Sequence, residues 1–283
     1  MKKSISIAFS PDTDDAFMVH PMRAGWTDVG NYEFTYTAAD IQALNEQAQR
    51  GVYDVTAISI AAYPSLADEY LLMPIGASIG DEFGPAIIVR EDSPLTTVQD
   101  LIGRRVAIPG RQTSAFFAAR GLIGAFDEVP LPFHAIGQAV MSGEVEAGIL
   151  IHELQLDCET KGFRKLGDLG KLWATHESGL PLPLGANAIR RSLGAQTISE
   201  ITAIMRSSIE EGLRRREETL RAALGQSQAD LDLAGGDRYI SMYVNHRSLG
   251  FAPDVRQAVS RLFTIGGEAG LCRPVALADA MYE

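Results

Sequence analysis

One histidine, His152, stands where a proton acceptor could act. It follows the apolar run 147–151, which is typical of a buried strand, and so marks the carboxyl end of that strand. In open α/β sheets this edge faces the ligand crevice. Imidazole has an unperturbed pKa of about 6.5 and can accept a proton near neutral pH. A core histidine satisfied by main-chain groups is the alternative, and the local context alone favours it.

A second candidate is the segment 110–115, which follows a predicted strand at 105–108 and opens a predicted helix. The first N–H groups of a helix have no partner within the helix and can bind an anion. The hydroxyls of Thr113 and Ser114 stand beside them. The segment therefore suits a carboxylate, although either hydroxyl could simply cap the helix.

Three carboxylates, Asp12, Asp14 and Asp15, follow the first predicted strand. Clustered oxygen ligands suit magnesium. Acidic residues at a helix start are also stabilised by the helix dipole, and this explanation is favoured. We expect Asp15 to accept a hydrogen bond from a substrate hydroxyl or to cap the helix, and no metal site is predicted.

Strand-like and helix-like periods alternate along the chain, which predicts an α/β fold with mainly parallel strands. Ile5, Ile7 and Phe9 mark the first strand, and Asp40 is expected to cap a helix that ends at Gly51. The segment 179–185 alternates leucine and proline and is predicted to be an extended connector. Further strands are expected at 55–60, 84–89, 105–108 and 147–151, and further helices at 97–103, 197–224, 234–244 and 253–269.

Composition excludes several classes of protein. The 283 residues include 25 basic and 36 acidic ones, and the net charge of -11 would repel nucleic acid. No apolar run is long enough for a membrane span. The two cysteines have no metal-ligand or disulfide-framework spacing. The start of the chain contains no apolar signal-peptide core, so a cytoplasmic location is expected.

A chain of this length is expected to form about two domains. Crossings near residues 84–90 and 180–187 would divide the chain into a first lobe, formed by 1–88 and 187–283, and a second lobe, 89–186. A cleft between two lobes is where a small ligand binds.

Three motifs resemble signatures of the two-lobed periplasmic-binding-protein-like (type II) fold with a central cleft; they lie at 51–59, 100–109 and 143–148. Longer matches resemble the 1,4-dihydroxy-6-naphthoate synthase family and span nearly the whole chain in order. These are Ile108-Pro109-Gly110-Arg111-Gln112-Thr113-Ser114-Ala115-Phe116-Phe117, 143–153 with its Ile-His-Glu end, 178–186, and Tyr243-Val244-Asn245.

The resemblance implies a lyase of the futalosine route to menaquinone that cleaves cyclic dehypoxanthinyl futalosine without metal or organic cofactor. His152 occupies the family's catalytic-histidine position. The positions implied to bind the small anionic substrate are Ser10, Asp15, Asn45, Ser59, Thr113, Ser114 and Ala115.

One loop departs from the family pattern. Members commonly carry Ser-Pro-Cys-Pro-Asn-Asp-Thr-Phe after the first strand, whereas this chain has Ser10-Pro11-Asp12-Thr13-Asp14-Asp15-Ala16-Phe17. Two other functions remain open. The sister enzyme chorismate dehydratase has a similar fold but should lack the Ile-His-Glu end. The alternative that is not an enzyme is a solute-binding protein for a small organic anion.

Overall fold

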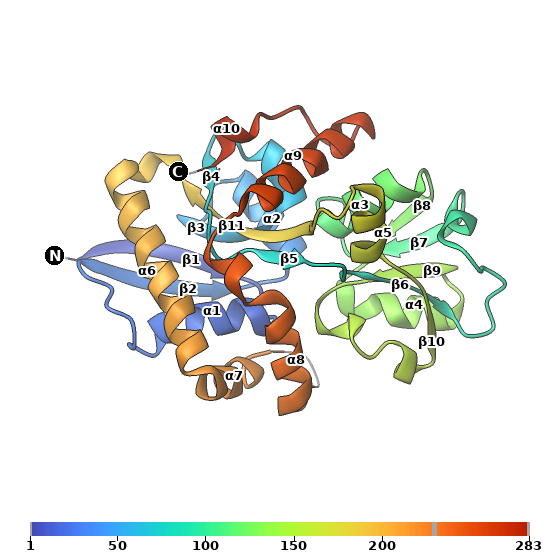
Figure 1. Ribbon diagram of the computed structural model, residues 1–283, viewed down its shortest axis with the longest axis horizontal. Coiled ribbons are helices and arrows are strands. Elements are labelled where there is room, and N and C mark those ends of the chain that lie inside the picture. Colours follow the sequence, from blue (N-terminus) through green and yellow to red (C-terminus); the bar gives the residue numbers. More distant parts are fainter. Residues whose placement is uncertain (1, 228–230, 282–283) are drawn as a thin grey trace.

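Two β-sheets organise the protein, whose computed structural model describes residues 2–227 and 231–281. Figure 1 shows the sheets at opposite ends of the long axis of the molecule. Within the described residues the first sheet has the strand order β2-β1-β3-β11-β4, with β5 also paired to β11. Its strands are β1 (Lys3–Phe9), β2 (Tyr32–Ala38), β3 (Val55–Ser59), β4 (Tyr70–Leu72), β5 (Ser78–Gly80) and β11 (Leu182–Arg190).

The second sheet has the order β10-β6-β9-β7-β8. Its strands are β6 (Ala86–Arg90), β7 (Arg105–Ile108), β8 (Asp127–Pro130), β9 (Ala147–Leu150) and β10 (Phe163–Asp168). The chain passes to this sheet between β5 and β6 and returns before β11. The predicted borders 88/89 and 186/187 fall within β6 and β11, and the division into domains at those positions stays a prediction.

Helices cover both sheets and join them. The helices that belong with the first sheet are α1 (Thr13–Arg23), α2 (Ile41–Gln49), α6 (Ala195–Arg214), α7 (Arg216–Leu224), α8 (Leu233–Tyr243), α9 (Pro253–Glu268) and α10 (Leu277–Ala280). Those of the second are α3 (Ser114–Ile123), α4 (Ile136–Ser142) and α5 (Leu169–His176). Short 3₁₀ helices lie at Ile60–Ser65, Val98–Leu101, Phe133–Ala135, His152–Gln155, Glu159–Lys161, Arg191–Leu193 and His246–Leu249.

Several elements confirm the sequence prediction because local capping chemistry specified them. The carboxylate of Asp40 accepts the main-chain N–H of Gln42 at the start of α2, as a helix cap does. Thr113 likewise caps α3 by accepting the N–H of Phe116. The strand at 105–108 matches β7.

Two predictions about strands are wrong. The strands are not mainly parallel, because β6 and β11, which enter the sheets after the crossings, run antiparallel to their neighbours. The segment 179–185 is not wholly a connector, since β11 begins at Leu182. Pro183 lies where the register between β11 and β5 shifts, a place that tolerates a residue without an N–H donor.

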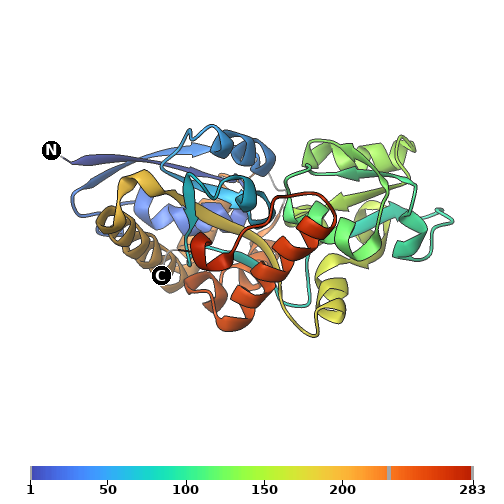
Figure 2. The ribbon, with the colours of Figure 1, turned by 90° about the horizontal axis from the view of Figure 1, so that it is seen from above.

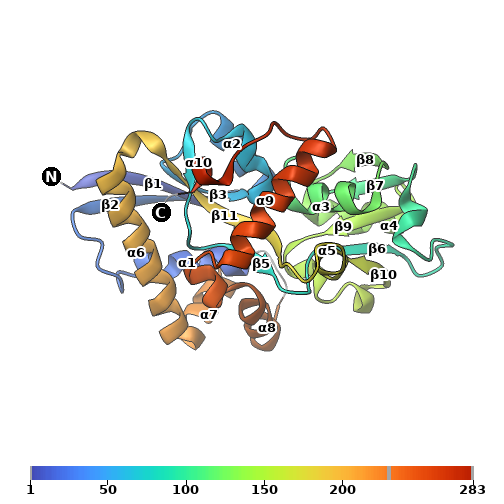
Figure 3. The same cartoon turned by 45° about the horizontal axis from the view of Figure 1, so that its top comes forward.

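One hydrophobic cluster continues from the first sheet into the second. It includes Ile58 of β3, Val106 of β7 and Leu262 of α9, all fully buried. Figures 2 and 3 show α9 reaching from the first sheet toward α3, against which it packs. The two lobes therefore share apolar contacts as well as the two chain crossings.

The first turn of α5 packs directly on the crossing between the sheets. A Cβ atom at Gly170 would lie 2.1 Å from the carbonyl carbon and oxygen of Phe83. We therefore expect Gly170→Ala to lower the free energy of unfolding by about 1–3 kcal/mol, as overpacking does. The matched control is Gly267→Ala in α9, where a Cβ meets nothing within 4 Å and alanine has the better helix propensity. Urea unfolding midpoints test this, and equal midpoints for the two variants would contradict the packing argument.

Candidate active site

A cavity lies between the two lobes, at the ends of four strands. Ser10 directly follows β1 and Ser59 ends β3, while Thr113 and His152 come after β7 and β9. β1 pairs parallel with β3, and β7 pairs parallel with β9, so each lobe brings two carboxyl strand ends to one edge. The lining residues are Ser10, Asp12, Asp14, Asp15, Ile41, Ala57, Ile58, Ser59, Ser78, Pro85, Thr113, Ser114, Ala115, Ile151, His152, Gln155, Leu184, Gly185, Ala186, Tyr239 and Tyr243.

The structure brings together all but one of the predicted site residues. Those that line the cavity are Ser10, Asp15, Ser59, Thr113, Ser114, Ala115 and His152. Asn45 is fully buried and does not line it. Its Nδ2 donates to the Ser59 hydroxyl at 3.2 Å, and its Oδ1 accepts the Ser59 N–H at 2.9 Å. Asn45 therefore bears on the cavity only through Ser59.

The start of α3 forms the wall contributed by the second lobe. The Thr113 hydroxyl donates to the carbonyl oxygen of Gly110 at 2.8 Å while it caps the helix. The Ser114 hydroxyl donates to the carbonyl oxygen of Leu184 at 2.6 Å and accepts the N–H of Ala61 at 3.1 Å. The predicted anion site is compatible with this cap, because a cap of this kind engages only part of the first turn.

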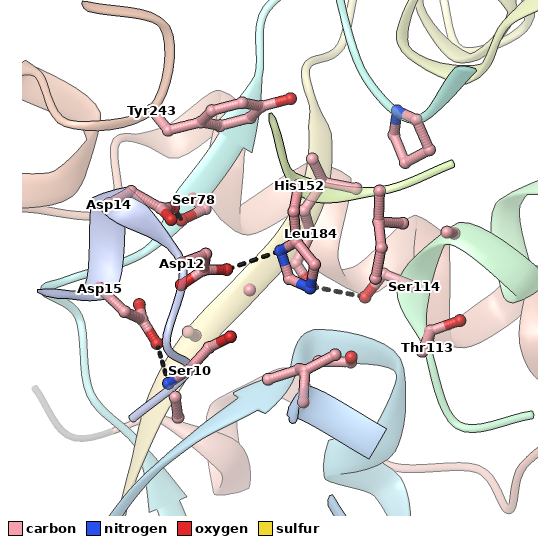
Figure 4. Close-up of a pocket in the computed structure, with 18 of the residues that line it drawn as sticks. Ser10, Asp12, Asp14, Asp15, Ser78, Thr113, Ser114, His152, Leu184 and Tyr243 are labelled. Carbon is pink, nitrogen blue, oxygen red and sulfur yellow. Dashed lines mark hydrogen bonds and ion pairs between the residues drawn. The ribbon is translucent and has the colours of Figure 1, made fainter. Parts of the chain in front are cut away.

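His152 is held by a carboxylate from the opposite lobe. Its Nδ1 lies 2.6 Å from Oδ2 of Asp12, and the side chains of both are about nine-tenths buried, with 11% and 10% exposure. The backbone of His152 is left-handed, with φ 57°. The edge of Phe133 packs on the ring at a centroid distance of 4.9 Å. Among the described residues, Nε2 of His152 has no hydrogen-bond partner, and Figure 4 shows the ring between Asp12 and Ser114.

The charge of this histidine is set by its neighbours. Burial alone would lower the pKa of His152, but the charge and hydrogen bond of Asp12, with smaller contributions from Glu153 and Asp14, raise it to about 9. The imidazole of the ligand-free protein therefore carries a proton at neutral pH.

Four carboxylates surround that proton. One oxygen each of Asp12, Asp14 and Asp15 lies within 4.8 Å of the others. Asp15 accepts the N–H of Ser10 at 2.8 Å and Asp14 accepts the hydroxyl of Ser78 at 2.6 Å. Glu153 accepts the N–H and hydroxyl of Thr13 at 2.7 and 2.5 Å.

Burial, together with mutual repulsion, makes the three aspartates of this cluster reluctant to ionise. Burial, with the charge of Asp14, raises the pKa of Asp15 to about 7. Burial, with the charge of Asp12, also raises the pKa of Asp14 well above its ordinary range. The side of the cavity next to α1 is therefore rich in hydrogen-bonding oxygens and unfavourable for a further anion.

Two tyrosines of α8 also line the cavity and were not among the predicted site residues. Tyr239 and Tyr243, one helical turn apart, line the cavity with ring centroids 4.9 Å apart. The hydroxyl of Tyr243 accepts Nε2–H of Gln155 from the other lobe at 2.8 Å. Burial raises the pKa of Tyr239 well above its ordinary range, so its hydroxyl stays neutral. The i, i+4 spacing of the two aromatics was the available signal.

Solved structures define the class of fold. The alkanesulfonate-binding protein of Xanthomonas axonopodis has a TM-score of 0.72 at 17% identity, over 99% of this chain and 98% of that one. A protein of Archaeoglobus fulgidus has a TM-score of 0.88 at 37% identity, over 95% of this chain and 98% of that one. The protein thus has the α/β fold of the periplasmic binding proteins, as predicted. Within the described residues, no helix is both long and apolar enough to span a membrane.

The family follows from sequence. A family model described as menaquinone biosynthesis matches residues 5–268, and the chain belongs to this family. Two relatives carry the name 1,4-dihydroxy-6-naphthoate synthase. The Streptomyces coelicolor protein is 34% identical over 276 residues, which cover 95% of this chain and 94% of the relative. The Thermus thermophilus protein is 33% identical over 272 residues, with 96% and 97% covered. The predicted family is confirmed.

The pairing of Asn45 with Ser59 generates a stability prediction. Asn45→Ala removes both partners of Ser59 and leaves buried polar groups unsatisfied, which costs about 1–3 kcal/mol each. Ser59→Ala removes only the hydroxyl and keeps the main-chain bond, so its cost should be smaller. Urea unfolding of both variants gives the order, and a Ser59→Ala variant less stable than Asn45→Ala would contradict it.

Proposed function

We propose that the protein is a cofactor-independent carbon–carbon lyase that converts cyclic dehypoxanthinyl futalosine to 1,4-dihydroxy-6-naphthoate in menaquinone biosynthesis. The names of its relatives support this activity. The main structural support is the state of His152. Its ring is buried in the cavity wall, and its Nε2 has no hydrogen-bond partner among the described residues. In the neutral form of the ring, such a nitrogen can take a proton from a bound substrate.

The polarity of the cavity supports one orientation of an anionic substrate. Carboxylates gather at the α1 side, while the first turn of α3 presents the positive end of a helix dipole at Thr113, Ser114 and Ala115. We propose that the substrate carboxylate binds at α3. Its hydroxyls then face Ser10 and Asp15, with Ser59 on the adjoining strand end.

In this arrangement the chain's own groups supply the chemistry. His152 Nε2 accepts the proton whose removal starts the cleavage. The rings of Tyr239 and Tyr243 exclude water from the reacting carbons and stack on a flat ring system.

The direct test is to incubate purified protein with cyclic dehypoxanthinyl futalosine in excess chelator and detect the naphthoate by mass. The proposal predicts product under these conditions. Binding of the substrate without product would favour a solute-binding protein, and dependence on added magnesium would assign a cation to the carboxylates. A cytoplasmic location is part of the proposal, and cell fractionation tests it.

We expect His152→Asn to abolish most of the activity. Asparagine keeps hydrogen bonding and similar volume but cannot accept a proton. Turnover should fall by about 100-fold to 10,000-fold, the usual contribution of acid–base catalysis, while substrate affinity measured by calorimetry changes little. A variant that keeps most of its turnover would shift the role to a carboxylate such as Asp15 or Glu153.

The pH dependence follows from the raised pKa of His152. Only the neutral imidazole is a base, and it is populated as the pH rises through about 9. The kcat/KM of the wild type should therefore rise about tenfold per pH unit below that value. In His152→Asn the residual activity should lack this limb. A wild-type profile that is flat from pH 6 to 9 would contradict the assignment of the base.

A further inference from the structure

Asp12 stands at the N-cap of α1 but does not act as a cap. Its backbone is extended, as at an N-cap, yet its side chain makes no cap hydrogen bond. Aspartate at this position ordinarily accepts an N–H of the first turn. Here the carboxylate instead points toward His152, with Oδ2 at 2.6 Å from Nδ1 (Figure 4).

This contact determines which nitrogen of the ring exchanges protons. A carboxylate at Nδ1 keeps a hydrogen on that atom, because Nδ1–H is the donor to Oδ2 in both charge states of the ring. The other nitrogen, Nε2, has no partner among the described residues. Phe133 packs against the same ring, so the imidazole is fixed by an edge contact as well as by the ion pair.

The geometry points to Asp12 as the positioning residue of His152: it fixes the ring with Nδ1 bonded and Nε2 free for the substrate. The expected effect of Asp12 on turnover rests on the proposed function, whereas its effect on the orientation and pKa of the His152 ring does not. Asp12 acts through His152 and need not touch the substrate, which is the role of the carboxylate in a nucleophile–histidine–carboxylate triad.

The two partners come from different lobes. Asp12 lies between β1 and α1, and His152 follows β9 of the second sheet. The neighbouring contact, Glu153 to Thr13, bridges the same two elements. The base is thus completed only where the lobes meet, so the positioning of the proton acceptor depends on how the two lobes pack together.

Other charged groups also act on His152 and must be separated from Asp12. The titratable groups that face or adjoin it are Asp12, Asp14 and Asp15 around the start of α1, Glu153 beside it, His134 next to Phe133, and Tyr239 and Tyr243 of α8. Asp14 provides a matched comparison. Its carboxylate is buried in the same cluster, but it is hydrogen-bonded to Ser78 and not to the imidazole.

The first experiment needs no substrate. The imidazole of His152 is titrated by NMR in wild type, Asp12→Asn and Asp14→Asn, with its signal assigned through His152→Asn. We expect Asp12→Asn to move the pKa of His152 from about 9 toward the ordinary 6.5, and Asp14→Asn to move it less. The other histidine signals serve as an internal check of folding; they belong to His20, His134, His176 and His246.

The second experiment is a double-mutant cycle on turnover. Measured above pH 9, where the ring is neutral in both proteins, Asp12→Asn should lower kcat by about 100-fold with a small change in KM. The acid limb of its pH profile should lie at lower pH than that of the wild type. In a His152→Asn background the same substitution should cost nothing further, because Asp12 acts through the ring.

The outcomes separate the two proposals. Equal movement of the His152 titration in Asp12→Asn and Asp14→Asn, or additive losses in the cycle, would overturn the positioning role. Absence of turnover in the wild type would instead overturn the proposed function, and the titration would still decide the role of Asp12.

Discussion

The buried contact between Asp12 and His152 is the interaction on which the rest of the site depends. Both side chains are about nine-tenths buried, and neither could remain charged there without the other. Removal of one partner would therefore favour the neutral form of the other, and the strong charge-assisted contact between the lobes would be lost. The pair therefore holds the start of α1 to the end of β9 and sets the protonation of the cavity at the same time.

The two ends of the cavity differ in their electrostatic character. Burial, followed by mutual repulsion, raises the pKa values of the aspartates at the start of α1, while the charge and hydrogen bond of Asp12 keep the proton on the imidazole at neutral pH. The opposite wall is the start of α3, where the helix dipole favours a negative group. A substrate that carries a carboxylate at one end and hydroxyls at the other matches this polarity.

The sequence predicted those parts of the fold that local chemistry specifies. Caps at Asp40 and Thr113 placed α2 and α3, and alternation placed β1. The antiparallel entry of β6 and β11 into their sheets was not predictable, because periodicity carries no strand direction. Most of the candidate site was predicted from strand ends and from family positions. The link between Asp12 and His152 was missed, since residues 140 apart along the chain meet only when two sheets pack together.

The strands beside the two crossings align the lobes, and with them the contact between Asp12 and His152. β5 and the start of β11, the strands beside the two crossings, pair with each other through Leu182 opposite Gly80. A two-stranded ribbon bends readily out of its plane but resists sliding within it, because sliding breaks the ladder of hydrogen bonds. The pairing therefore opposes sliding of one lobe past the other. Because this pairing sets how the two lobes lie relative to each other, it also sets which nitrogen of His152 the carboxylate of Asp12 meets.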